Sequence, residues 1–91
     1  MKYKIQVTLN DIQKGKRDHR SCCPVAKAIR RQTTLKQFCV NDGYLSIFDD
    51  DAWEIEEIQF PKKVVDFVNK FDENGAKAVK PFDFVLNLKA A

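Results

Sequence analysis

The sequence predicts a single α+β domain with the element order β-α-β-β-β-α-β. Segments in which polar and apolar residues alternate occur near both ends and in the middle of the chain, and this alternation is typical of half-buried strands. Two other segments repeat apolar residues at helical spacing, and each opens with a proline, which suits the first turn of a helix. A hydrophobic content of 44% is enough for one small core, and no linker or internal repeat divides the chain. We therefore expect one domain over residues 1–91.

The first third of the chain predicts a strand, a helical turn and a helix. Residues 4–9 alternate strictly between polar and apolar side chains, which indicates a strand. A capping-box-like start follows at residues 10–13, and Gly15 ends that short turn. Pro24 then opens a helix expected over residues 23–32. Its buried face should consist of Val25, Ala28, Ile29 and Gln32.

The middle of the chain predicts three short strands. We expect strands over residues 35–40 and 44–48, joined by an Asn-Asp-Gly turn at residues 41–43 that supplies the positive φ a hairpin needs. A third strand is expected over residues 53–60. Its apolar residues change phase along the strand, which predicts a β-bulge near residues 56–57.

The last third predicts a helix followed by a strand. Pro61 opens the helix, and residues 72–75 end it. Its apolar stripe consists of Val64, Phe67, Val68 and Phe71. Alternation returns over residues 82–88 and predicts the final strand. Meandering strands with two such helices predict a small antiparallel sheet of four to five strands with both helices on one face.

Charge is distributed unevenly. Residues 1–40 carry a balance of 10 − 2 = +8, and residues 41–91 carry a balance of 6 − 11 = −5. Seven cations fall within eighteen residues: Lys14, Lys16, Arg17, Arg20, Lys27, Arg30 and Arg31. They predict a surface that binds nucleic-acid phosphates or an acidic protein, and the alternative is a solvated helix face beside a loop. Because no aromatic residue is interleaved with these cations, phosphate-backbone or carboxylate contact is favoured over base stacking.

An acidic segment surrounds the single tryptophan, Trp53. Its members are Asp49, Asp50, Asp51, Glu54, Glu56 and Glu57. A calcium loop would need a central glycine, and none lies among them. The segment is either a solvated turn and strand or a docking patch for a basic partner with Trp53 as its anchor. We expect Trp53 to lie in the core.

The chain has three cysteines, Cys22, Cys23 and Cys39. An odd number with an adjacent pair is typical of reduced thiols. The helix start and Arg20 favour a lowered pKa for the first two thiols. Zinc binding through His19 and the three cysteines is possible by count, but adjacent cysteines rarely share one tetrahedral ion and the C-x₂-C spacing is absent. The simplest interpretation is that small side chains pack at the start of a helix.

Signatures of enzymes and of membrane insertion are missing. The sequence has no P-loop, G-x-G-x-x-G, G-x-S-x-G or H-E-x-x-H motif, so we predict no catalytic residue, metal or cofactor. The apolar runs are too short to span a membrane, and the N-terminal segment lacks the apolar region and cleavage site of a signal peptide. We expect a cytoplasmic, non-enzymatic monomer.

Two groups of short motifs carry a resemblance to a known family. The first group is Thr8-Leu9-Asn10-Asp11-Ile12, Gly15, Arg17, Cys23-Pro24-Val25-Ala26 and Ala28-Ile29. The second group is Phe60-Pro61, Val64, Phe67-Val68, Phe71-Asp72, Pro81-Phe82-Asp83-Phe84 and Leu86. With these motifs the chain resembles an uncharacterised family of small proteins from tailed bacteriophages and prophages, over most of its length. Relatives often carry C-x₂-C-P, and here Arg20 stands where the first cysteine would be, which weakens the case for a metal or disulfide site.

The resemblance implies a role inside an infected bacterial cell. Small phage proteins of this kind look like host-takeover or anti-defence factors, and anti-CRISPR proteins that dock on type I surveillance complexes are the analogue considered first. We therefore predict a protein that blocks a host protein or ribonucleoprotein complex by occlusion through the seven cations. A phage accessory protein that contacts nucleic-acid phosphates is the second hypothesis, and a thiol- or zinc-dependent protein is a distant third.

Overall fold

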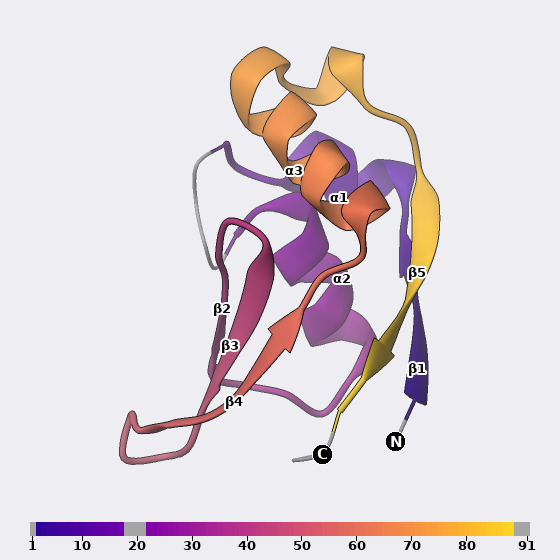
Figure 1. Cartoon of the computed structure of the whole chain (residues 1–91). Helices are drawn as coiled ribbons and strands as arrows, with labels where there is room; N and C mark the ends of the chain where they lie inside the picture. The colour runs from indigo at the N-terminus through magenta and orange to yellow at the C-terminus, as the bar shows by residue number, and fades with distance from the viewer. Residues whose placement is uncertain (1, 18–21, 89–91) are drawn as a thin grey trace.

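The structure is a computed structural model that describes residues 2–17 and 22–88 (Figure 1). Its elements are β1 (Lys2–Val7), α1 (Leu9–Lys14), α2 (Pro24–Gln32), β2 (Phe38–Val40), β3 (Tyr44–Phe48), β4 (Glu54–Gln59), α3 (Lys62–Asn74), a 3₁₀ turn η1 (Ala76–Ala78) and β5 (Phe82–Asn87). The α+β class is confirmed, and the helical turn predicted near residue 10 is the short helix α1. None of the helices described is long and apolar enough to cross a bilayer.

The five strands form two antiparallel sheets, whereas the sequence predicted one sheet of four to five strands. Strand β1 pairs with β5, with Lys2 opposite Asn87, and β2, β3 and β4 form a three-stranded meander. Helix α2 lies between the sheets and contacts both β1 and β2 (Figure 1).

The burial of α2 explains this division. Ala26 is fully buried together with the predicted Val25, Ala28 and Ile29, so the apolar surface of α2 is wider than a single stripe. A helix that is apolar on more than one side needs cover from more than one direction. The expected packing of both helices on one face of one sheet is therefore replaced by a helix between two sheets.

Aromatic side chains connect the third helix and the meander to β5. The ring centroid of Phe67 on α3 lies 4.6 Å from that of Phe82, and Phe60, directly after β4, makes an edge-to-face contact with Phe84 at 6.1 Å. Such pairs contribute about 0.5–1.5 kcal/mol beyond the area they bury. Both sheets therefore share one hydrophobic core.

The entrance to β4 differs from the prediction for Trp53. Its side chain is 73% exposed and does not belong to the core. The expected bulge is present one residue earlier than predicted, because Ile47 pairs with Glu56 and Phe48 with Glu54, which leaves Ile55 without a strand partner. A bulge of this kind bends the strand and changes the direction of its side chains.

Candidate functional site

Four of the seven predicted cations line one groove between α1 and α2. The groove has a volume of about 310 Å³, and its lining residues are Asn10, Asp11, Lys14, Lys27, Arg30 and Arg31. Lys14 lies at the end of α1, while the other three cations follow the i, i+3, i+4 spacing that places residues on one face of α2. With one carboxylate among four cations, the groove carries a charge of 4 − 1 = +3.

A capping box forms the helix that carries Lys14. The Thr8 hydroxyl accepts a hydrogen bond from the Asp11 N–H at 3.3 Å, and Asp11 Oδ2 accepts one from the Thr8 N–H at 2.9 Å. These two bonds satisfy donors that a helix start otherwise leaves unpaired, which lets a helix of six residues form. The helix starts two residues earlier than predicted, and Asp11 was not among the predicted site residues. The Thr-x-x-Asp spacing is the signal that identifies it.

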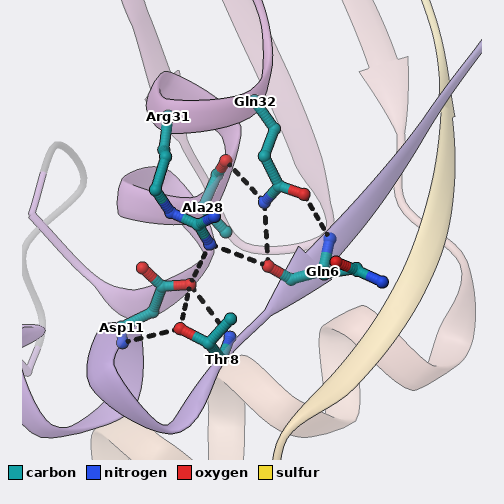
Figure 2. Close-up of polar contacts among 6 residues, drawn as sticks. All are labelled: Gln6, Thr8, Asp11, Ala28, Arg31 and Gln32. Atoms are coloured by element: carbon teal, nitrogen blue, oxygen red, sulfur yellow. Dashed lines mark hydrogen bonds and ion pairs between the residues drawn. The ribbon is translucent and has the colours of Figure 1, made fainter.

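Arg31 connects the groove to the capping box and to β1 (Figure 2). Its Nη2 donates to Asp11 Oδ2 at 2.7 Å and to the Gln6 carbonyl at 3.1 Å. The Arg31 side chain is 48% exposed, so one side of the guanidinium is fixed by the protein and the other faces solvent. A fixed guanidinium loses little conformational entropy on binding an anion.

Gln32 strengthens the same junction. Its Nε2 donates to the carbonyls of Gln6 (2.8 Å) and Ala28 (3.0 Å), and its Oε1 accepts from the Gln6 N–H (3.0 Å). The end of β1 is thus held against α2 by side-chain hydrogen bonds on both its N–H and its C=O (Figure 2). This arrangement fixes the position of α2, and with it the three cations on its groove face.

Two of the remaining predicted cations, Arg17 and Lys16, do not line this groove. Arg17 donates through Nε and Nη2 to the Asp72 carbonyl, at 3.0 and 2.8 Å, and through Nη2 to the Glu73 carbonyl at 2.7 Å. These carbonyls belong to the last turn of α3, where hydrogen bonds from outside the helix commonly satisfy the backbone, so Arg17 has a structural role. Lys16 is exposed and is not among the lining residues. Arg20 lies outside the described residues.

Arg30 brings an aromatic ring close to the groove. Its guanidinium carbon lies 5.2 Å from the centre of the Phe38 ring, a cation–π contact. Phe38 is only 4% exposed, so its ring cannot stack on a nucleic-acid base. The groove therefore offers cationic donors and no exposed aromatic ring among its lining residues, which suits contact with phosphates or carboxylates rather than base recognition.

The cysteines are free thiols, and Cys23 packs at the start of a helix as the simplest interpretation of the sequence predicted. Cys23 caps α2, and its Sγ accepts a hydrogen bond from the Ala26 N–H at 3.5 Å. Burial raises the pKa of the Cys23 thiol because desolvation outweighs the backbone hydrogen bonds that favour the thiolate. The predicted lowering of this pKa is wrong, since Cys23 is 4% exposed. Cys22 and Cys39 are half-buried.

The part of the chain that the structure describes gives no support to the zinc hypothesis. His19 lies outside it, and no group of three or more His, Cys, Asp or Glu side chains within residues 2–17 and 22–88 is arranged to hold a metal ion.

Comparison with known proteins finds no match for this chain among family models, curated proteins or solved structures. The resemblance to phage proteins therefore stays a prediction, and the functional argument depends on the groove.

Proposed function

We propose that this chain is a non-enzymatic binding protein that uses the groove between α1 and α2 to dock on a polyanionic surface of a nucleoprotein partner. The observation that carries the proposal is the gathering of Lys14, Lys27, Arg30 and Arg31 around one groove. Cations lining a concave surface attract an anionic partner more strongly than the same charges spread over the molecule.

The chemistry of the groove suits oxygen anions. Arg31 is held by Asp11 and the Gln6 carbonyl, and a guanidinium fixed in this way can present its remaining N–H donors to a phosphate or carboxylate. The two lysines supply mobile point charges beside it. A rigid donor with flexible neighbours favours contact with a charged surface of variable shape.

The narrower form of the proposal is that the protein blocks a host machine by occlusion, as phage anti-CRISPR proteins do to type I surveillance complexes. It is supported by the resemblance of the motifs, by the small size of the chain and by the opposed charges of its two halves. A protein that acts by occlusion needs a folded binding surface and no catalytic residues.

A second candidate function is direct binding to the nucleic-acid backbone. The observation that favours it is the buried state of Phe38 beside Arg30, which leaves charge without base stacking at this edge of the groove. Such binding would be insensitive to base sequence and would weaken steeply with salt.

The test is capture of partners from a bacterial lysate with the immobilised protein and two charge variants. The first variant, Lys14→Gln with Lys27→Gln, removes two positive charges from the groove. The matched control, Lys62→Gln with Lys77→Gln, removes two exposed positive charges elsewhere. We expect the groove variant to lose the partner and the control to keep it.

Two arms separate the candidate functions. A protein partner that stays bound after nuclease treatment supports docking on a complex. Direct binding predicts instead that nuclease abolishes capture, and that a labelled single-stranded RNA binds with a salt dependence reduced by about 1.4 in the slope of log K against log salt when both lysines are removed. Equal capture by both charge variants would contradict the proposal.

A further inference from the structure

Among the residues that the structure describes, strand β4 is an edge strand. It pairs with β3 on one side, and no other described strand pairs with it on the opposite side. The Phe60 N–H donates to the Gly43 carbonyl at 3.0 Å, so the backbone of Phe60 faces β3. Because backbone groups alternate along an antiparallel ladder, the N–H and C=O groups of Glu57 and Gln59 point away from β3. An unpaired row of this kind is a template for another strand.

Two large apolar side chains are exposed at the entrance to this edge. Trp53 is 73% exposed and Ile55 is 51% exposed. The turn before them is held by Asp49, whose Oδ1 accepts from the N–H groups of Asp51 (2.9 Å) and Trp53 (3.0 Å). The backbone that carries Trp53 is therefore fixed, and the ring is presented to solvent instead of folding back on the core. Trp is among the residues most often found at the energetic centre of an interface.

The charge of this edge selects its occupant. Residues 49–61 contain six acidic residues and no Lys or Arg. Glu54 and Glu57 are exposed on β4, as are Asp50 and Asp51 in the turn before it. A second copy pairing through its own β4 would bring acidic strands together, and like charges on facing strands destabilise a pair. A basic strand would face opposite charges instead.

We propose that the β4 edge accepts an extended, Lys- or Arg-rich segment of a partner protein as a fourth strand of the β2-β3-β4 sheet. The partner's backbone pairs with Glu57 and Gln59, its basic side chains face Glu54 and Glu57, and an apolar side chain packs on Trp53. This is the strand-addition mode, in which main-chain hydrogen bonds provide affinity and side-chain contacts provide specificity. The inference uses other elements than the basic groove and does not depend on the function proposed for it.

Trp53 provides the assay because it is the single tryptophan of the chain. The probe is a synthetic ten-residue peptide of alternating Lys and Val, titrated into the intact protein. Strand addition moves the indole from water into an apolar contact, so we expect a saturable shift of its fluorescence to shorter wavelengths. A peptide of alternating Glu and Val should give no shift.

Two controls separate strand pairing from simple attraction of charge. A Lys–Val peptide that is N-methylated at every residue keeps its charges and side chains but has no backbone N–H to donate to the ladder from either edge, and we expect it to bind at least roughly tenfold more weakly. Charge reversal at Glu54→Lys with Glu57→Lys should weaken binding at least about tenfold, whereas the matched reversal Asp66→Lys with Glu73→Lys on α3 should leave it within about twofold.

Three results would overturn the proposal. One is an unchanged Trp53 spectrum at saturating Lys–Val peptide. Another is equal binding of the N-methylated peptide, which would mean attraction without pairing. The third is a shift that depends on protein concentration in the absence of peptide, which would identify a second copy of the chain as the occupant.

Discussion

Replacing Asp11 with asparagine is expected to destabilise the protein and to strengthen its binding to a polyanion. Asp11 is 5% exposed and accepts hydrogen bonds from the Thr8 backbone and hydroxyl and from Arg31. It is also the carboxylate that lines the basic groove. One substitution therefore acts on the fold and on the candidate site in opposite directions.

The loss of stability follows from the contacts that change. The introduced side-chain amide can still accept from the Thr8 N–H, but the bond to Arg31 loses one charged partner, which costs about 1 kcal/mol when the arginine remains half-exposed. Loss of a negative charge in the first turn of α1 costs a further amount of roughly 0.3–1 kcal/mol. We expect a total of about 1–2 kcal/mol, and for a chain of this size that lowers the Tm by roughly 5–15 °C.

The gain in binding follows from Coulomb's law. Removing one negative charge about 6 Å from a bound phosphate, in a solvated groove, is worth about 0.7 kcal/mol, or about a threefold tighter Kd. The charge of the groove rises from +3 to +4, and the bond from Arg31 to the Gln6 carbonyl still holds the guanidinium in place. The salt dependence of binding should become steeper for the same reason.

The assay is fluorescence anisotropy with a labelled single-stranded RNA at low ionic strength and at a temperature where circular dichroism shows both proteins folded. The matched control is Asp83→Asn, which removes an exposed negative charge from β5 that lies 3.6 Å from Lys4 and outside the groove. We expect tighter binding only for Asp11→Asn. Weaker or unchanged binding by the folded Asp11→Asn protein would refute the assignment of the groove as the anion site.

Three further substitutions test the structural account. Gly15→Ala would place a Cβ 2.6 Å from Pro24 Cγ and Cδ, so we expect a loss of about 1–3 kcal/mol in urea unfolding; a neutral result would contradict this close packing. Arg17→Met keeps the apolar stem but removes the hydrogen bonds to the end of α3, and should cost about 1 kcal/mol without changing RNA affinity. The raised pKa of Cys23 means that the folded protein holds the thiol proton more tightly than the unfolded chain, so stability is complete below about pH 8.5 and falls as the pH rises above it. Cys23→Ala should remove that part of the pH dependence in unfolding measured between about pH 7 and 10, and an identical slope in both proteins would argue against the burial of this thiol.

The elements of this fold could be predicted because each depends on local spacing. The stripe from Val64 to Phe71 and the alternation around Phe84 are repeated within a few residues, and both segments form as expected. The assignment of strands to two sheets could not be predicted in the same way. The division into two sheets depends on how wide the apolar surface of α2 is. Ala26 widens that surface, but its small, weakly hydrophobic side chain does not stand out in the sequence.

The position of Trp53 shows where residue type misleads. Tryptophan and isoleucine favour a core position, but the strand carries acidic residues on both faces, with Glu56 on one face and, because of the bulge, Glu54 and Glu57 together on the other. A strand with charges on both faces cannot bury either one without cost. The acidic residues on both faces of β4 are therefore a sequence signal for an exposed strand, in addition to the phase change of its apolar residues that predicts the bulge.

The candidate site was predicted only in part. A count of charges along the sequence does not show which cations are bound to groups that are distant in sequence. Arg17 belongs to the basic run, but its guanidinium is bound to carbonyls of α3 that lie more than fifty residues away. Lys14 and Lys27 are thirteen residues apart and still line one groove, because α1 packs against α2. Only the tertiary structure shows that Arg17 is bound to α3, that Lys14 and Lys27 face the groove, and that Arg31 both lines the groove and binds Asp11.

The pairing of β1 with β5 constrains how this protein is made. During translation β1 leaves the ribosome long before its partner, since Val7 pairs with Phe82, which is added 82 − 7 = 75 residues later, a step that takes roughly 4–15 s. Throughout that interval its backbone has no strand to pair with, and the nascent segment is exposed to association with other chains. Lys2 and Lys4, whose side chains stay in water in the finished protein, give that segment a positive charge that opposes such association. Folding of the β1–β5 sheet is consequently a late step, and a ribosome stalled before residue 82 would carry a chain that cannot complete it.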